Sequence, residues 1–302
     1  MHAARRLTYL LVALLVAVTA AAPSDAARER GAPTGACAHW RVRTLLHDQG
    51  WLENLGFDGR GGLTISALTQ GRILRLSRSG RLKTLVASVH APGAQARSGR
   101  WLYFNTGDTL PLMPNGTIDR FDLRTGKRRT WASGLTMPNG LALLPNGDAV
   151  VSRDLGTGTG LTRVRARDPR HPQFNWAKID DTNGLAVDPS GRWLYVNRTF
   201  TTDGEVDRIR IAHPGVIQPV GRLGAGVAPD DLTVDRKGIL YIAGFQSGSI
   251  YRLNPKTHRS CVIATGLSQP TSVRFGGPGW NRRALYATDA GGHLSVLLPP
   301  RR

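Results

Sequence analysis

The chain has 302 residues, a length that allows one large all-β domain or two smaller ones. Its 36 glycines and 18 prolines stand between short apolar runs, which indicates many turns and few long helices. The formal net charge of +19 would suit a nucleic-acid-binding protein. The cations, however, are mostly single Arg residues with no dense run and no nucleic-acid motif, so we expect no specific nucleic-acid partner.

Residues 1–26 have the pattern of a signal peptide. Arg5 and Arg6 precede an apolar run over residues 7–18, and small residues follow as far as residue 26. The run is short for a membrane span, although an uncleaved anchor is the alternative. We predict a secreted or cell-envelope protein with a linker over residues 27–36 and no transmembrane segment in the mature chain. The basic surface of such a protein would favour anionic cell-envelope polymers as partners.

A strand with no hairpin partner of its own is expected over residues 39–47, and repeats follow it. Asn139, Asn183 and Asp230 each lead a short apolar strand, a tight turn and a second apolar strand, which is a β-hairpin pattern. These leading residues are 44 and 47 positions apart. That spacing is typical of one four-stranded propeller blade.

Further repeats begin near residues 55, 100 and 270, which gives six blades. The sixth repeat is one strand short, and the unpartnered strand at 39–47 supplies what it lacks. We therefore predict an all-β fold, a six-bladed β-propeller over residues 37–300 whose last blade is closed by an N-terminal strand.

Cys37 and Cys261 are the only cysteines. An oxidising compartment favours their pairing, which would clasp the start of the propeller to the outer strand of its fifth blade. The alternative is two unpaired thiols.

The polar leading residues predict a metal site. The innermost strand of every propeller blade starts at the same end of the central channel, so Asn139, Asn183 and Asp230 are expected to form an arc there. Glu53 has the corresponding place in the first blade. Two carboxylates and two amide oxygens suit Ca²⁺, with Zn²⁺, Mn²⁺ or Mg²⁺ as alternatives. The competing interpretation is that these are ordinary Asn-Gly turns.

The repeats resemble the six-bladed family of gluconolactonases, regucalcin (senescence marker protein) and luciferin-regenerating enzyme. Diisopropyl fluorophosphatase and the paraoxonases share the architecture. The resemblance implies a catalytic divalent metal, usually Ca²⁺, held by a Glu in the first blade, an Asn in the third, an Asn in the fourth and an Asp in the fifth. This chain supplies Glu53, Asn139, Asn183 and Asp230 in that order.

The chain also departs from that family in places. Met137 stands where the sugar-lactone members tend to carry an Arg, and Asp231 stands where many have a Gly. No His pair aligns with that of the paraoxonases. These departures leave the substrate less well defined than the fold.

The resemblance implies a metal-dependent hydrolase of lactones or related small-molecule esters, and we expect the protein to be a monomer. Asp230 is the expected acid/base or nucleophilic carboxylate, and Glu53 mainly anchors the metal. Asp231 is expected either to assist proton transfer or to be a solvated turn residue. Further pocket candidates are Arg153, Asp154, Arg198 and Phe245. The alternatives are a phosphotriesterase of the same architecture and a non-catalytic, calcium-stabilised binding propeller at the cell envelope.

Overall fold

The computed structural model describes residues 37–109, 113–153, 155 and 160–300. The predicted signal peptide and linker, and the candidate Asp154, lie outside this part of the chain. The described residues belong to one compact unit. They contain no helix that is long and apolar enough to cross a membrane.

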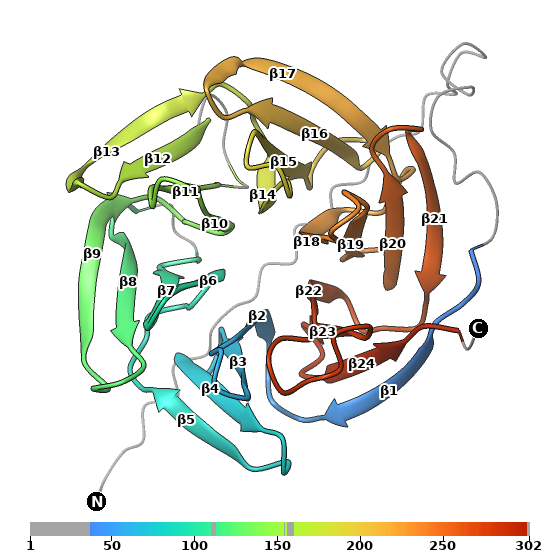
Figure 1. The fold of residues 1–302 in the computed structure, drawn as a ribbon, viewed down its shortest axis with the longest axis horizontal. Coiled ribbons are helices and arrows are strands. Elements are labelled where there is room, and N and C mark those ends of the chain that lie inside the picture. The colour runs from blue at the N-terminus through green and yellow to red at the C-terminus, as the bar shows by residue number, and fades with distance from the viewer. Residues whose placement is uncertain (1–36, 110–112, 154, 156–159, 301–302) are drawn as a thin grey trace, which may run out of the picture. The chain divides into compact units, whose positions relative to one another are not determined.

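Six four-stranded antiparallel sheets are arranged in a ring, as predicted (Figure 1). The strands of each blade are given from the inner strand outward. The first blade contains β2 (Leu52–Phe57), β3 (Gly62–Ala67), β4 (Arg72–Ser77) and β5 (Leu82–Val86), and the second contains β6 (Gln95–Ser98), β7 (Trp101–Thr106), β8 (Gly116–Asp122) and β9 (Arg128–Leu135). The third contains β10 (Leu141–Leu143), β11 (Ala149–Val151), β12 (Leu161–Arg165) and β13 (Asp168–Ala177). The fourth contains β14 (Thr182–Val187), β15 (Trp193–Arg198), β16 (Glu205–Arg210) and β17 (His213–Arg222). The fifth contains β18 (Pro229–Val234), β19 (Leu240–Gly244), β20 (Ser249–Asn254) and β21 (Arg259–Ala264). The sixth contains β22 (Pro270–Phe275), β23 (Leu285–Asp289), β24 (Leu294–Leu298) and β1 (Arg41–Leu46).

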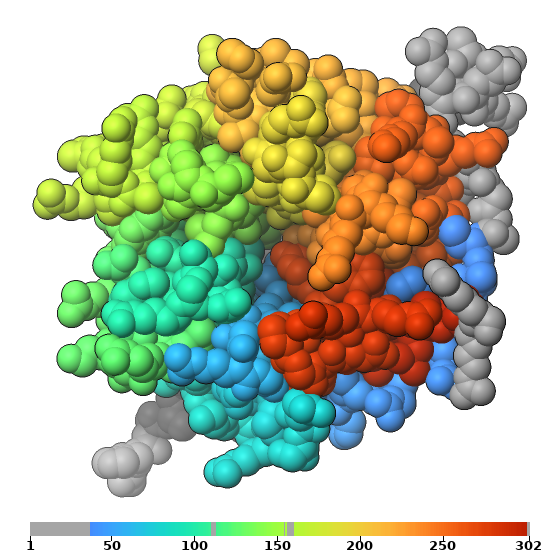
Figure 2. Space-filling model, in the orientation of Figure 1, coloured from blue at the N-terminus to red at the C-terminus, as the bar shows by residue number. Residues whose placement is uncertain are grey.

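Apolar side chains hold neighbouring blades together. Each hydrophobic cluster combines side chains of two adjacent blades, as where Leu55 of the first blade packs with Tyr286 of the sixth. Because each sheet packs against a neighbour on both faces, strands such as β3 are buried at every position. In Figure 2 the blades fill successive coloured sectors of this ring, with the last blade against the first.

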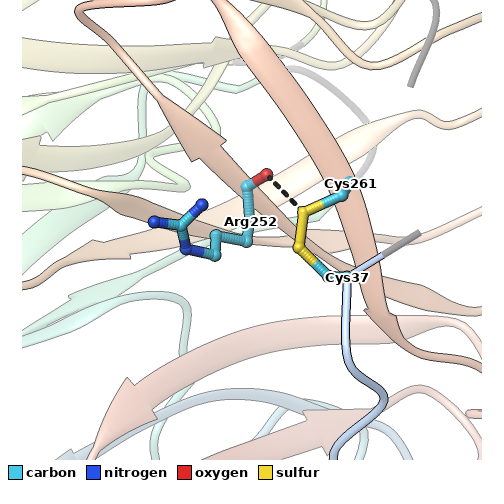
Figure 3. The surroundings of a disulfide bond; sticks show 3 residues. All are labelled: Cys37, Arg252 and Cys261. Atoms are coloured by element: carbon cyan, nitrogen blue, oxygen red, sulfur yellow. Dashed lines mark hydrogen bonds between the residues drawn. A yellow bond between two sulfur atoms is a disulfide. The ribbon is translucent and has the colours of Figure 1, made fainter. Parts of the chain in front are cut away.

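The ring closes as the sequence predicts. The N-terminal strand β1 pairs antiparallel with β24, from Arg41 opposite Leu298 to Leu46 opposite Leu294. Cys37, just before β1, forms a disulfide with Cys261 in β21, the outer strand of the fifth blade, and their Cα atoms are 5.7 Å apart (Figure 3). The Sγ atom of Cys261 lies 3.8 Å from the carbonyl oxygen of Arg252 on the adjacent strand β20 (Figure 3). The predicted disulfide is therefore present.

The inner strand of the second blade, β6, escaped sequence-based prediction. Its residues Gln95-Ala96-Arg97-Ser98 have no apolar run. Gln95 is nonetheless buried, because its backbone N–H donates to Asn54 Oδ1 and its side-chain Nε2 to Ser66 Oγ. Hydrogen bonds to the first blade thus take the place of apolar packing.

The chain connections define two ends of the ring. Inner strands begin at one end, where the links between blades and the turns between second and third strands also lie; we call it the leading end. The turns between first and second strands, and between third and fourth strands, lie at the other, which we call the hairpin end.

Candidate functional site

The four predicted metal ligands occupy equivalent places at the leading end. Glu53, Asn183 and Asp230 are the second residues of their inner strands, and Asn139 stands two residues before β10. All four are buried, with 4–9% of their surface exposed. Their side chains are therefore placed where the channel begins, and common ligation of a cation by them stays a prediction.

Small residues bring these positions together. A side chain at Gly140 would collide with the backbone carbonyl of Asn183, and one at Gly184 with that of Asp230. The Asn-Gly pairs are therefore not ordinary turns. Glycine follows each Asn because the inner strands of the third, fourth and fifth blades approach too closely for a Cβ atom.

Two further asparagines, which sequence reasoning missed, hold the backbone of the leading residues. Asn105 at the end of β7 donates from Nδ2 to the carbonyl oxygen of Asn139 over 2.8 Å. Asn197 in β15 donates to the carbonyl oxygen of Asp230 over 2.7 Å. Both side chains are fully buried. Their matching place near the ends of second strands, each one blade ahead of the residue it holds, is the sequence signal that could have revealed them.

The chemistry of the site fits a hard divalent cation. The side-chain Oδ1 of Asn183 is buried and accepts no hydrogen bond from the part of the chain that the structure describes. A buried carbonyl oxygen without a donor is costly unless something electropositive meets it. Two carboxylates and two amides are the oxygen donors that Ca²⁺ prefers. Within the described ranges no three His, Cys, Asp or Glu side chains form a metal-binding group, so the amides are essential to such a site.

Aromatic side chains stand beside Glu53. The indole Nε1 of Trp51 donates to Glu53 Oε2 over 2.6 Å, and the Trp51 ring stacks on Phe245 with centroids 5.8 Å apart. Phe245 is a predicted pocket residue that follows β19. It contacts Trp51, and Trp51 contacts the predicted metal ligand Glu53. Trp51 was not predicted. Its indole N–H holds one carboxylate oxygen of Glu53.

Asp108 is a further unpredicted acid at the leading end. It follows β7, is 6% exposed, and its Oδ2 accepts a hydrogen bond of 3.3 Å from the side-chain amide of Asn139. This bond orients the amide so that Nδ2 is occupied by Asp108. Oδ1 of Asn139 is then the atom suited to a cation.

Asp231 is buried, not a solvated turn residue. Its Oδ2 accepts hydrogen bonds from Asn54 (2.8 Å) and Ser272 (2.5 Å) and pairs with Arg274 (2.7 Å). Its Oδ1 accepts the backbone N–H of Leu232. With its carboxylate engaged on both oxygens, Asp231 is a structural residue that links blades beneath the leading residues, and it is poorly placed to transfer protons.

The predicted pocket residues Arg153 and Arg198 are also engaged by the protein. Arg153 Nε donates to the carbonyl oxygen of Leu155 over 2.8 Å. Arg198 Nη1 pairs with Glu205 at 2.7 Å and lies 3.8 Å from Asp207. Burial, reinforced by Glu205, raises the pKa of Asp207 to about 6 even though Arg198 and Arg222 oppose the shift. The guanidinium of Arg198 thus interacts with the acidic residues Glu205 and Asp207 of the fourth blade.

Comparison with known proteins confirms the predicted resemblance. Residues 156–291 match the family model of the SMP-30/gluconolactonase/LRE-like region. A 6-deoxy-6-sulfogluconolactonase from Pseudomonas putida is 26% identical over 225 residues. That alignment covers 70% of this chain and 66% of the relative, so the chain spans about two thirds of the curated relative that it matches.

Solved structures show the same fold. A gluconolactonase from Xanthomonas campestris superposes with a TM-score of 0.72 at 18% identity, covering 86% of this chain and 90% of that one. A calcium-binding protein, regucalcin, from Agrobacterium tumefaciens gives 0.71 at 18% identity, covering 87% and 95%. A luciferin-regenerating enzyme gives 0.67 at 17% identity, covering 86% and 95%. At these identities the likeness concerns the fold.

Proposed function

We propose, from the likeness to SMP-30/gluconolactonase/LRE-like proteins, that this chain is an exported, Ca²⁺-dependent hydrolase of lactones or related esters. The observation that carries the proposal is the burial of Glu53, Asn139, Asn183 and Asp230 at equivalent places, with Asn183 Oδ1 lacking a donor among the described residues. A purely structural role would leave this acceptor unsatisfied, and Oδ1 of both Asn105 and Asn197 likewise lacks a donor among the described residues.

The four leading residues would hold the cation through their side-chain oxygens. When bound, it supplies a Lewis acid for the carbonyl oxygen of the substrate and lowers the pKa of a nearby water. Trp51 keeps Glu53 in one orientation, and Asp108 does the same for Asn139. Asn105 and Asn197 fix the backbone from which Asn139 and Asp230 project. This rigidity pre-organises the site, so little reorganisation is needed during reaction.

Asp230 is the residue to which we assign proton transfer. Its carboxylate would accept a proton from the attacking water and return it to the leaving oxygen of the opened ester. We do not assign this role to Asp231, because both of its oxygens already accept hydrogen bonds. The Trp51–Phe245 pair supplies an apolar surface for the part of the substrate that does not react.

Hydrolysis of a lactone panel tests the proposal. The panel contains a polar sugar lactone, an alkyl-substituted lactone and a phosphotriester, each measured against its uncatalysed rate with and without chelator. We expect Asp230→Asn to lower lactone turnover by about 10²–10⁴-fold, as for loss of a general base. Asp235→Asn, a change of the same kind in a turn at the hairpin end, is the matched control and keeps wild-type activity. Wild-type lactone rates equal to background would refute the proposal, and faster triester turnover would favour the phosphotriesterase.

A further inference from the structure

The two ends of the ring carry opposite charge. In the connections at the hairpin end, the cations are Arg60, Arg78, Arg81, Arg100, Arg124, Lys127, Arg167, Arg192, Arg236, Lys237, Lys256, Arg282 and Arg283, and each of these residues is exposed. The described connections at the leading end contain only Arg153 and Lys178 as Lys or Arg, beside Asp48, Asp108, Asp180, Asp181 and Asp203. Among the described connections, positive charge is therefore concentrated at the hairpin end.

Acidic residues at the hairpin end are fewer than these cations and are engaged in the turns. Asp58, Asp148, Asp188 and Asp235 each accept backbone N–H groups of their own turns or of a neighbouring turn. Asp58 and Asp148 are also buried and pair with the strand residues Arg75 and Arg163. These carboxylates shape the turns, while the turn cations point to solvent.

A hollow continues the basic face toward the centre of the ring. A cavity of about 400 Å³ is lined by the ends of the inner strands, including Phe57, Val187 and Val234, and by Arg97 and Arg274. These strand ends lie at the hairpin end. Arg97 adds a guanidinium to the lining of the hollow, whereas the guanidinium of Arg274 is paired with Asp231. The headgroup plane of a bilayer could not follow into this hollow, but a flexible chain could.

Two tryptophans near the hairpin end, Trp101 and Trp193, are covered by guanidiniums. Arg100 and Arg120 lie over the ring of Trp101, with distances of 4.8 and 4.7 Å to the ring centroid. Arg208 lies 4.3 Å from the centroid of Trp193. Arg100 also pairs with Asp122, and Arg208 donates to Gln218, so these guanidiniums are held in place over the rings. Because the rings of Trp101 and Trp193 are covered in this way, and the ring of Trp280 packs edge-to-face with Phe57 and Tyr286, base stacking by single-stranded nucleic acid is disfavoured.

We propose that the hairpin end is a docking surface for a linear, non-nucleic polyanion, one that carries phosphate, sulfate or carboxylate groups along a flexible chain. Arginine, which supplies most of the face, matches these groups with paired N–H donors. The leading end, with its candidate metal site, would remain turned away from the polymer and open to small molecules. This inference does not depend on the hydrolase assignment, because it concerns the opposite end of the ring.

Binding of long-chain inorganic polyphosphate at increasing salt tests the proposal. The face variant is Arg236→Ser/Lys237→Ser/Arg282→Ser/Arg283→Ser. Its control, Arg43→Ser/Lys83→Ser/Arg170→Ser/Lys178→Ser, removes the same charge from exposed positions outside the hairpin-end connections. We expect the face variant to lower affinity by about tenfold or more, and to flatten the dependence of affinity on salt, while the control stays within about threefold of the wild type. Arg124→Ser/Lys127→Ser, on the second blade, gives an independent test if the first variant does not fold.

Three results would overturn the proposal. Equal losses in the face and control variants would show that net charge alone attracts the polymer. Binding that resists salt would exclude an electrostatic surface. Attachment to phosphatidylglycerol vesicles without binding of polyphosphate would assign the face to a membrane.

Discussion

The side-chain amide of Asn54 donates a hydrogen bond to the carboxylate of Asp231 over 2.8 Å, which joins the inner strands of the first and fifth blades. Ser272 and Arg274 of the sixth blade contact the same carboxylate oxygen. One buried acid therefore links the three blades around the point of ring closure, directly after the leading residue Asp230.

Removal of this acid is expected to destabilise the propeller. Asp231→Ala leaves the Arg274 guanidinium and the Asn54 amide without their partner in a largely buried place, so the free energy of unfolding should fall by about 3–5 kcal/mol. Chemical denaturation measures the change. Asp203→Ala, which breaks an ion pair with Arg222 whose two side chains are about 45% exposed, is the control and should cost less than about 1 kcal/mol. Equal effects of the two substitutions would contradict a linking role for Asp231.

The disulfide is expected to contribute strongly to stability. It closes a loop of 224 residues, and the chain-entropy relation gives a stabilisation of about 5 kcal/mol. The double substitution Cys37→Ser/Cys261→Ser avoids an unpaired thiol and should lower the denaturation midpoint. Hydrogen exchange should show the loss first in β1, which the disulfide anchors. An unchanged midpoint would mean that the pairing of β1 with β24 closes the ring without it.

Asp207 and Asp188 should give opposite pH dependences. Because the pKa of Asp207 is raised to about 6 from 3.8 by burial, the folded protein holds a proton that the unfolded chain releases. The contribution of Asp207 to the free energy of unfolding is therefore lost as pH rises from about 4 to 6. Asp207→Asn should raise the free energy of unfolding by about 1–3 kcal/mol at pH 7 and change it little below pH 4.

Asp188 provides the contrast. Burial raises its pKa, but hydrogen bonds from Ser190, Trp193 and Arg192 outweigh burial and hold the pKa below 3.8. The contribution of Asp188 to the free energy of unfolding is present above the pKa that this residue has in the unfolded chain, and it is lost as pH falls. Asp188→Asn should therefore lower the free energy of unfolding at pH 7 and have no effect in acid. Unfolding curves of both variants at several pH values test the pair. A change of the same sign in the free energy of unfolding of both variants at pH 7 would contradict the opposite pKa shifts of Asp207 and Asp188.

Asn197 should act on the site without touching a cation. Its side chain holds the backbone of Asp230, so Asn197→Ala is expected to weaken Ca²⁺ binding by about 10–100-fold, the usual cost of losing a residue that orients a ligand. Calorimetric titration with Ca²⁺ gives the affinity separately from turnover. Asn281→Ala, an exposed position in the turn before β23, is the matched control. An unaltered affinity for Asn197→Ala would remove this residue from the account.

The sequence was sufficient to predict the ring because its signals recur. Asn139, Asn183 and Asp230 lead copies of one hairpin, and the unpartnered strand at 39–47 matched the incomplete last blade, as β1 and β24 confirm. The disulfide followed from the two cysteines. β6 was missed because Gln95 is buried by hydrogen bonds and not by apolar character, and a pattern of hydrophobicity cannot detect that.

The surroundings of the site were harder to predict. Trp51, Asn105, Asn197 and Asp108 act through contacts with leading residues, mostly on other blades, and such contacts exist only after the ring has closed. Asp231 follows a leading acid in the sequence, yet its partners come from the first and sixth blades as well as its own. Nothing near it in the chain identifies Asn54 or Arg274.

Calcium titration of metal-stripped protein, with lactone hydrolysis followed at each addition, tests the central claim most directly. We predict that activity rises in proportion to one bound cation per chain. Asn183→Ala, which removes one of the buried oxygens without a donor among the described residues, should bind the cation at least tenfold more weakly. Full hydrolytic activity of the stripped protein before any cation is added, or a Ca²⁺ affinity of Asn183→Ala equal to that of the wild type, would contradict this prediction.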